Sequence, residues 1–196
     1  EDSVCIDGVT TLTLADFRLV GSAKQLESRI ELTSTEQFQS GAAWVRNKLP
    51  VKAGFDISFK FRLLQGNDNG QLDLGSPGAD GVAVVFQNSS PVALGKPGDG
   101  IGYNELPHGI AVEFDSYLNA AFSDSSTSHI AVQKGDGRIL RPWHVPPFYL
   151  GGSFSQSPVF KADGTIYHAR IQLDGTTLHV YCDTVGLLLK PIVSIA

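Results

Sequence analysis

Short apolar segments rich in Val, Ile, Phe, Thr and Leu recur along the whole chain, separated by Gly, Asp, Asn, Pro and Ser. This rhythm is typical of β-strands joined by turns, because strands are short and turns need those residue types. Residues 55–63 alternate apolar and polar side chains, so one face of that strand is expected to be buried. Residues 82–86 are apolar on both faces and are expected between two layers. The sequence therefore predicts an all-β fold, an antiparallel β-sandwich without long helices.

The same pattern predicts a single domain. A chain of 196 residues can bury roughly 70% of its unfolded surface in one core. Residues 1–196 contain neither an internal repeat nor a linker-like stretch. Asp174 and Gly175 separate two alternating segments and predict a hairpin turn. The expected strands cover residues 9–14, 26–33, 42–45, 55–63, 81–87, 110–115, 129–133, 165–173 and 177–182.

Composition argues against a nucleic-acid partner and against insertion into a membrane. The net charge is −5 and only 18% of residues are charged, without a basic cluster, so a nucleic-acid partner is not expected. No apolar run approaches the ~20 residues that span a bilayer, so membrane insertion is not expected.

Other features favour a secreted or cell-surface protein, or one in the secretory pathway. The chain begins at Glu1 without Met, which indicates a mature or trimmed form. Cys5 and Cys182 could form one disulfide across a very long loop, as secreted proteins often do, or they could be two buried thiols. Asn88 begins an N-glycosylation sequon just after an expected strand.

One polar stretch carries candidate ligands. Glu113 and Asp115 are two residues apart on an expected strand, so they share a face. Asn119 and Asp124 follow in a loop, and His129 begins the next strand. Neighbouring carboxylates repel unless a cation or a proton lies between them. Oxygen ligands suit Ca²⁺, whereas an imidazole beside carboxylates suits a transition ion such as Mn²⁺. From the residues alone, a metal site and a solvated acidic turn both remain open.

The stretch Ala-Val-Glu113-Phe-Asp115-Ser-Tyr-Leu-Asn119, with Asp124 and His129 after it, resembles the double-metal motif of the legume-type (L-type) lectins. Further motifs follow in family order, so the resemblance covers nearly the whole chain. These motifs are Gly-Ser-Ala at 21–23, Leu-Thr at 32–33, Gln-Ser-Gly-Ala-Ala-Trp at 39–44, residues 78–87, residues 98–103 and residues 167–175. The resemblance implies a jelly roll like that of concanavalin A, with a flat back sheet and a curved front sheet.

The resemblance also implies two adjacent metal sites. A transition ion, Mn²⁺ or a similar divalent ion, would be held by Glu113, Asp115, Asp124 and His129. A Ca²⁺ ion would be held by Asp115, Asn119, Asp124 and the backbone carbonyl of Tyr117. Such ions would do no chemistry; they would fix the loop and preorganise a binding site.

A carbohydrate site is implied beside the metals. Asp80 matches the family aspartate that accepts hydrogen bonds from two sugar hydroxyls, and the peptide bond before it is expected to be cis. Asn119 would donate its amide to a hydroxyl, and the ring of Tyr117 would contact the apolar sugar face. A backbone N–H of the Gly-rich loop would complete the site, with Gly98 and Gly100 both candidates.

These implications predict a Ca²⁺-dependent, non-catalytic lectin domain that binds glycans or glycoproteins. Jelly-roll glycoside hydrolases carry a third acid at the position of Tyr117, so an enzyme is not expected. An adhesion or protein-recognition module on the same fold is the main alternative. Trp44 is expected to pack in the core, and His144 is expected at the surface. Residues 138–158, rich in proline and aromatic residues, are expected to form a long loop that either folds over a sheet edge or presents a partner surface.

One departure from the family concerns the last residues. The family pattern continues after residues 177–182 with a last front-sheet strand and a loop that helps to select the sugar. Here the sequence ends at Ala196, where that strand would begin, so the domain is expected to be incomplete at this end relative to the family. Three readings stay open: the protein was longer and was cut, another segment supplies the strand, or this member lacks it. An open sheet edge invites pairing, which makes a homo-oligomer through sheet edges a further expectation.

Overall fold

The computed structural model describes residues 11–65, 78–124, 126–155 and 158–196. These residues form strands and short 3₁₀ helices (η), and none of the described helices is long and apolar enough to cross a membrane. The elements are η1 (Leu14–Asp16), β1 (Phe17–Gly21), β2 (Lys24–Leu26), β3 (Arg29–Glu31), β4 (Gly41–Val45), β5 (Phe55–Phe61), β6 (Gly81–Gln87), η2 (Gly98–Gly100), β7 (Gly109–Asp115), η3 (Ala120–Phe122), β8 (His129–Lys134), β9 (Tyr149–Ser153), β10 (Tyr167–Asp174), β11 (Thr177–Asp183) and β12 (Val193–Ile195).

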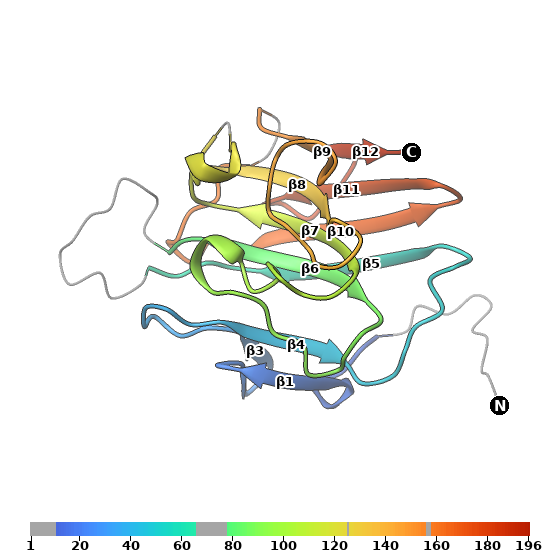
Figure 1. Ribbon diagram of the computed structural model, residues 1–196. Coiled ribbons are helices and arrows are strands. Elements are labelled where there is room, and N and C mark those ends of the chain that lie inside the picture. Colours follow the sequence, from blue (N-terminus) through green and yellow to red (C-terminus); the bar gives the residue numbers. More distant parts are fainter. Residues whose placement is uncertain (1–10, 66–77, 125, 156–157) are drawn as a thin grey trace.

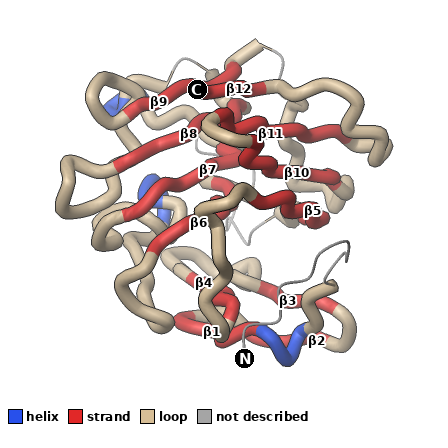
Figure 2. Tube along the Cα trace, turned by 90° about the vertical axis from the view of Figure 1, so that its right-hand side faces the viewer, coloured by secondary structure: helices blue, strands red, loops and turns tan. Residues whose placement is uncertain are grey.

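Two antiparallel four-stranded sheets form the body of the molecule. One has the order β6-β7-β8-β9 and the other β12-β11-β10-β5. The sheets lie face to face, and the pairs β1-β4 and β2-β3 lie together at one end, beyond β5 and β6 (Figures 1 and 2). The predicted antiparallel sandwich is therefore confirmed.

An aromatic layer fills the space between the sheets. Phe59 and Phe61 of β5 contact Phe114 of β7, with ring centroids 5.9 Å and 5.2 Å from it. Val112 and Phe114 are fully buried, and the alternating exposure of β5 matches the alternation of its sequence. Aromatic pairs at such distances add to the free energy gained by burying their area. The core is thus built from one face of each sheet.

A second apolar cluster covers the outer face of β6 and β7. Ala83, Val85 and Ala111 contribute to it from the two strands, and Trp44 packs against it. The indole N–H of Trp44 donates a hydrogen bond to the carbonyl of Ala93 at 2.8 Å. Both the two-faced burial expected for β6 and the packing role expected for Trp44 are confirmed.

Three expectations about elements were wrong. Residues 11–14 do not continue a strand; Asp16 Oδ2 accepts hydrogen bonds from the backbone N–H and the hydroxyl of Thr13, which forms a turn into η1. In place of the one strand expected over residues 26–33, the chain forms the two paired strands β2 and β3. The third error concerns β9, which lies inside the expected loop 138–158 and pairs with β8.

The glycine pair of β9 explains why it was missed. Glycine is unusual in strands, but a Cβ atom on Gly152 would lie 2.6 Å from the carbonyl oxygen of Ile130 on β8. The close approach of the two backbones therefore requires glycine there.

The last residues add to an existing sheet. β12 pairs with β11, in the sheet opposite β7. That the family's last front-sheet strand is missing here stays a prediction. Cys182 is buried in the core, and burial raises the pKa of its thiol to about 12. Cys5 lies outside the described residues, so the disulfide also stays a prediction.

Candidate metal centre and adjoining surface

Strand register brings the predicted ligands together. Asp115 at the end of β7 pairs with His129 at the start of β8 on one side and with Gly81, next to Asp80, on the other. Glu113 and His129 are fully buried, and Asp115 is only 3% exposed. The two carboxylates share the face opposite to Phe114, as the period of two predicts.

Glu113 is held by polar neighbours on several sides. Its Oε2 accepts a hydrogen bond of 2.6 Å from the hydroxyl of Tyr103, and its Oε1 accepts one of 3.2 Å from the amide of Gln133. Burial alone would raise the pKa of Glu113, but the nearby imidazoles of His129 and His144 outweigh burial and lower it to about 2. Glu113 is therefore a fixed, buried carboxylate.

His129 is oriented by the loop that precedes it. Its Nδ1 lies 3.1 Å from the carbonyl oxygen of Ser126. An N–H at this nitrogen donates to that carbonyl and leaves the lone pair of Nε2 directed at the carboxylates. Nε2 lies 3.6 Å from Glu113 Oε1 and 3.9 Å from Asp115 Oδ2. Metal-ligating histidines are commonly held in this way by a backbone carbonyl on the other nitrogen.

Carboxylates also organise the loop after β7. Asp115 Oδ1 accepts a hydrogen bond of 2.7 Å from the backbone N–H of Tyr117. Asp124 Oδ2 accepts one of 2.6 Å from the backbone N–H of Asn119. Burial, followed by the charge of Glu113, raises the pKa of Asp115 to about 9. Burial and the adjacent charge of Glu113 therefore disfavour the ionised form of Asp115.

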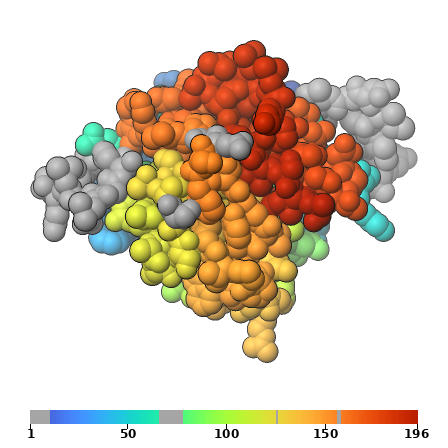
Figure 3. Space-filling view, turned by 90° about the horizontal axis from the view of Figure 1, so that it is seen from above, coloured from blue at the N-terminus to red at the C-terminus, as the bar shows by residue number. Residues whose placement is uncertain are grey.

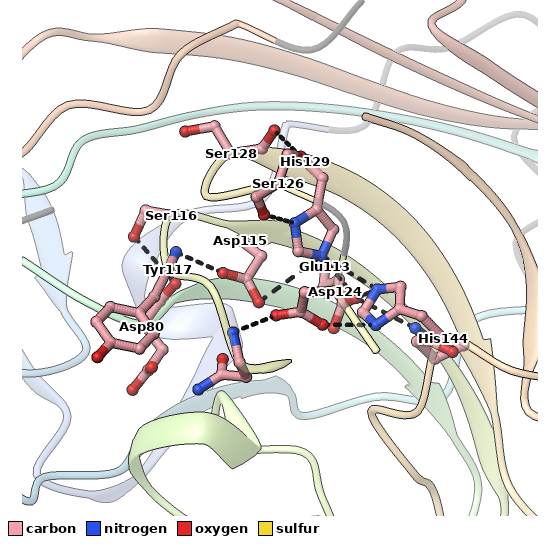
Figure 4. Close-up of polar contacts among 12 residues, drawn as sticks. Asp80, Glu113, Asp115, Ser116, Tyr117, Asp124, Ser126, Ser128, His129 and His144 are labelled. Atoms are coloured by element: carbon pink, nitrogen blue, oxygen red, sulfur yellow. Dashed lines mark hydrogen bonds and ion pairs between the residues drawn. The ribbon is translucent and has the colours of Figure 1, made fainter. Parts of the chain in front are cut away.

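His144 was wrongly expected at the surface. Its side chain is only 2% exposed, and its Nε2 lies 2.8 Å from Glu113 Oε1 (Figure 4). Its Nδ1 lies 2.8 Å from Asp124 Oδ1, and its backbone N–H donates to the carbonyl of Phe122. Burial would lower the pKa of His144, but its contacts with Asp124 and Glu113 raise it to about 10.

The segment that carries His144 covers the loop that carries Asp124. On the surface, the segment around residue 145 (orange) lies beside the loop around residue 120 (yellow) (Figure 3). His144 has no acidic neighbour at ligand spacing in the sequence, so the sequence pattern carries no direct signal for it. The one indirect sign of a role for His144 is its place in the segment that connects β8 to β9, two strands of the sheet that carries the site.

The gathered side chains fit a divalent cation. Glu113, His129 and His144 form one group of potential ligands, and Asp115, Asp124 and His129 form another, each with ligand atoms within 4.8 Å of one another. Asp124 Oδ1 is buried and lies 2.8 Å from His144 Nδ1. Carboxylate oxygens are the ligands that hard cations prefer, and imidazoles beside carboxylates also suit a transition ion.

Asp80 lies beside this cluster. The backbone N–H and hydroxyl of Ser116 both donate to the carbonyl oxygen of Asp80, at 2.8 Å and 3.0 Å. The peptide bond between Ala79 and Asp80 is cis, as expected. Burial, followed by the charge of Asp99, raises the pKa of Asp80 to about 6, although a hydrogen bond from the Asn119 side chain opposes this.

The two candidate glycines differ in position. Gly98 is exposed, and a Cβ atom there would lie 3.5 Å from Asp80 Oδ2. Gly100 is buried, and its Cβ would contact Lys96 and Asn104 instead. The structure therefore brings Asp80, Asn119 and Gly98 together and leaves Gly100 behind the loop. Tyr117 is half-buried at the start of the same loop.

Comparison with known proteins decides the family. The family model of the legume lectin β-barrel domain matches residues 10–183, which is most of the chain. This chain belongs to the legume lectin family. The resemblance seen in the sequence is therefore confirmed, together with the jelly-roll fold. Among characterised relatives, a pesticidal crystal protein, Cry22Aa of Bacillus thuringiensis, is 31% identical over 104 residues. That match covers 53% of this legume lectin domain and 13% of the crystal protein, so the chain spans only a small part of that relative.

Solved lectin structures share the fold. The exoplasmic/lumenal domain of VIP36 in a Ca²⁺/Man-bound form has a TM-score of 0.72 and 18% identity, covering 92% of this legume lectin domain and 70% of that chain. The winged bean acidic lectin complexed with methyl-α-D-galactose has a TM-score of 0.62 and 20% identity, covering 86% of this domain and 70% of that chain. At such identities the likeness establishes the fold alone.

Proposed function

We propose that this domain is a Ca²⁺-dependent, non-catalytic lectin that binds glycans and glycoproteins. The observation that carries the proposal is the position of Asp80, whose backbone is hydrogen-bonded to Ser116 and whose carboxylate accepts from Asn119. Through these contacts the loop that would hold metal also positions the carboxylate that would hold sugar. Membership of the legume lectin family supports the same function.

The metals would act on structure. Ca²⁺ would be held by Asp115, Asn119, Asp124 and the carbonyl of Tyr117, and the transition ion by Glu113, Asp115, Asp124 and His129. Bound cations would neutralise these buried carboxylates and hold the loop in one conformation. The exoplasmic/lumenal domain of VIP36 is known in Ca²⁺-bound forms, which is consistent with Ca²⁺ here.

Sugar recognition would use side chains of the loop after β7 together with Asp80 and the backbone of Gly98. Asp80 would accept hydrogen bonds from two adjacent hydroxyls, and the side chain of Asn119 would donate one. The ring of Tyr117 would contact the apolar sugar face. Exposed Gly98 lets a sugar approach its backbone beside Asp80, whereas Gly100 is a weaker candidate because it is buried. A VIP36 structure with mannose and a winged bean lectin structure with a galactoside support sugars as the ligand class.

The proposal includes two further points: the domain is not an enzyme, and it works outside the cytosol. The position where jelly-roll hydrolases carry a third acid is Tyr117, which lies beyond the last residue of β7. The matching VIP36 domain is described as exoplasmic/lumenal, which supports a location in the secretory pathway or outside the cell.

A glycan array tests the proposal. With Ca²⁺ and Mn²⁺ present, the domain is expected to bind a defined class of glycans, and treatment with EDTA should abolish that binding. Asp80→Asn should abolish it as well, because an amide in place of the carboxylate cannot accept from two hydroxyls through both oxygen atoms.

The matched control is Asp136→Asn, because Asp136 is exposed and lies outside the proposed site. Its amide oxygen can still accept the backbone hydrogen bonds from Arg138 and Ile139. This variant should bind like the parent. Absence of glycan binding by folded, metal-loaded parent protein would reject the lectin function and favour a protein-recognition module.

A further inference from the structure

His144 alters the metal centre that the family motif implies. The motif has one imidazole, whereas this structure places two imidazole nitrogens beside Glu113 (Figure 4). His144 Nε2 lies 2.8 Å from Glu113 Oε1 and 3.1 Å from His129 Nε2, and His129 Nε2 lies 3.6 Å from Glu113 Oε1. These three atoms form a compact triangle of potential ligands.

The size of this triangle suits one transition ion. Its edges of 2.8, 3.1 and 3.6 Å define a circle of radius about 1.9 Å, so one point can lie about 2.1 Å from all three atoms, as in Zn–N and Zn–carboxylate bonds. The three side chains come from β7, β8 and the segment before β9. Each is held at its place by the fold: Glu113 by Tyr103, His129 by Ser126 and His144 by its backbone bond to Phe122.

A second contact concerns the other ring nitrogen of His144. His144 Nδ1 lies 2.8 Å from Asp124 Oδ1, and both atoms are buried. A small tilt of the ring would let Nδ1–H donate to Asp124 while Nε2 faces an ion. A carboxylate on the second nitrogen of a metal-ligating histidine is a common arrangement.

We propose that Glu113, His129 and His144 hold the transition ion in this domain, and that this site prefers Zn²⁺ to Mn²⁺. Two imidazoles and one carboxylate favour Zn²⁺, and divalent zinc binds such ligands more tightly than manganese does. Asp124 orients His144, and Asp115 or water completes the shell. This inference rests on the metal site of the proposed function, and it concerns which ion that site takes.

The first test measures metal affinity on the whole chain. Protein stripped with EDTA is titrated by calorimetry with Zn²⁺, Mn²⁺ or Ca²⁺, for the parent, His144→Gln and the control His179→Gln. His179 lies on β11, in the opposite sheet, and contacts Ser194. The parent and the control should bind Zn²⁺ more tightly than Mn²⁺. His144→Gln should lose at least about 10–100-fold in Zn²⁺ affinity, because even the loss of a residue that only orients a metal ligand costs this much, and it should keep its Ca²⁺ affinity.

A second measurement needs no variant. Long-range ¹H–¹⁵N NMR spectra of the ¹⁵N-labelled parent report the state of the ring nitrogens of its five histidines. Zn²⁺ should shift Nε2 of two histidines, His129 and His144. A shift of one histidine, equal affinity in His144→Gln, or tighter binding in that variant would overturn the proposal. Tighter binding would mean that His144 occupies the place of the ion.

The outcome is separable from that of the lectin function. Glycan binding is scored with Ca²⁺ alone, and Zn²⁺ ligation is scored without sugar. Two ligated histidines in a protein that binds no glycan would support the metal site and reject the lectin. Glycan binding with one ligated histidine would support the lectin and reject His144 as a metal ligand.

Discussion

Phe114 separates the two acids of β7 and points the other way. It is fully buried between the sheets, with Phe59, Phe61 and Phe160 around it. Glu113 and Asp115 face the metal cluster from the opposite side of the same strand. The position of both acids therefore depends on how firmly this one ring is packed.

Replacing Phe114 by Ala should lower the free energy of unfolding by about 3–5 kcal/mol, because the change leaves a cavity in a packed aromatic layer. Urea denaturation of the metal-free protein measures this loss. Phe38→Ala is the control, since Phe38 is 90% exposed and its removal should change the free energy by less than about 0.5 kcal/mol. Similar losses for the two variants would contradict the packing described here.

For single residues, the sequence predicts the position of those side chains that follow the two-residue alternation of a strand. Glu113 and Asp115 had to share a face because strand side chains alternate, and His129 had to be near because it begins the neighbouring strand. His144 obeys no such rule. Its position depends on how the segment between β8 and β9 folds back over η3, and the sequence of that segment does not encode this contact by spacing.

The β10–β11 hairpin shows an element that the sequence predicted well. Asp174 pairs with Thr177 across the turn, and Gly175 has a φ of +60°. A Cβ atom on Gly175 would meet nothing within 4 Å, so substitution there tests backbone conformation alone.

Gly175→Ala should lower the free energy of unfolding by about 1–2 kcal/mol, the cost of the left-handed conformation for an L-residue. Gly175→Asn should cost less, because asparagine tolerates this conformation better. Chemical denaturation of the two variants and the parent gives the comparison. If Ala proved as stable as Asn, the turn would have a different conformation from that described.

β9 shows the opposite case. Its sequence Tyr-Leu-Gly-Gly-Ser is poor in strand formers and lies in a proline-rich stretch, so local preference argued for a loop. The strand forms because it pairs with the edge of β8. At position 152 the two backbones come so close that only glycine fits. Tertiary contact decided this element, and a single sequence does not display that contact.

Over the whole molecule, buried acids link stability to pH and to metal. The pKa of Asp115 is raised to about 9 and that of Asp80 to about 6, so without metal the folded chain binds more protons than the unfolded chain above about pH 4. The pKa of His144, raised to about 10, acts in the same direction above about pH 6.5. The contribution of these groups to stability is complete at low pH and is lost as pH rises through those values.

The melting temperature of EDTA-treated protein should therefore fall between about pH 5 and about pH 8, and Ca²⁺ with Zn²⁺ should raise it by more at the higher pH. Thermal unfolding across this range measures both effects. Asp115→Asn removes one of the raised acids and should flatten the slope of the metal-free protein. A melting temperature that rises with pH in EDTA would contradict these assignments.

The position of His144 against the carboxylates also affects how fast a metal ion can exchange. The ring nitrogens of His144 lie 2.8 Å from Glu113 and Asp124, whose side chains are 0% and 1% exposed, and its backbone N–H donates to the carbonyl of Phe122. We therefore expect that an ion enters or leaves this site when the segment between β8 and β9 moves aside. Exchange would then proceed at the pace of that opening, whatever the ion concentration outside. A domain with such slow exchange would stay loaded through brief passages into metal-poor surroundings.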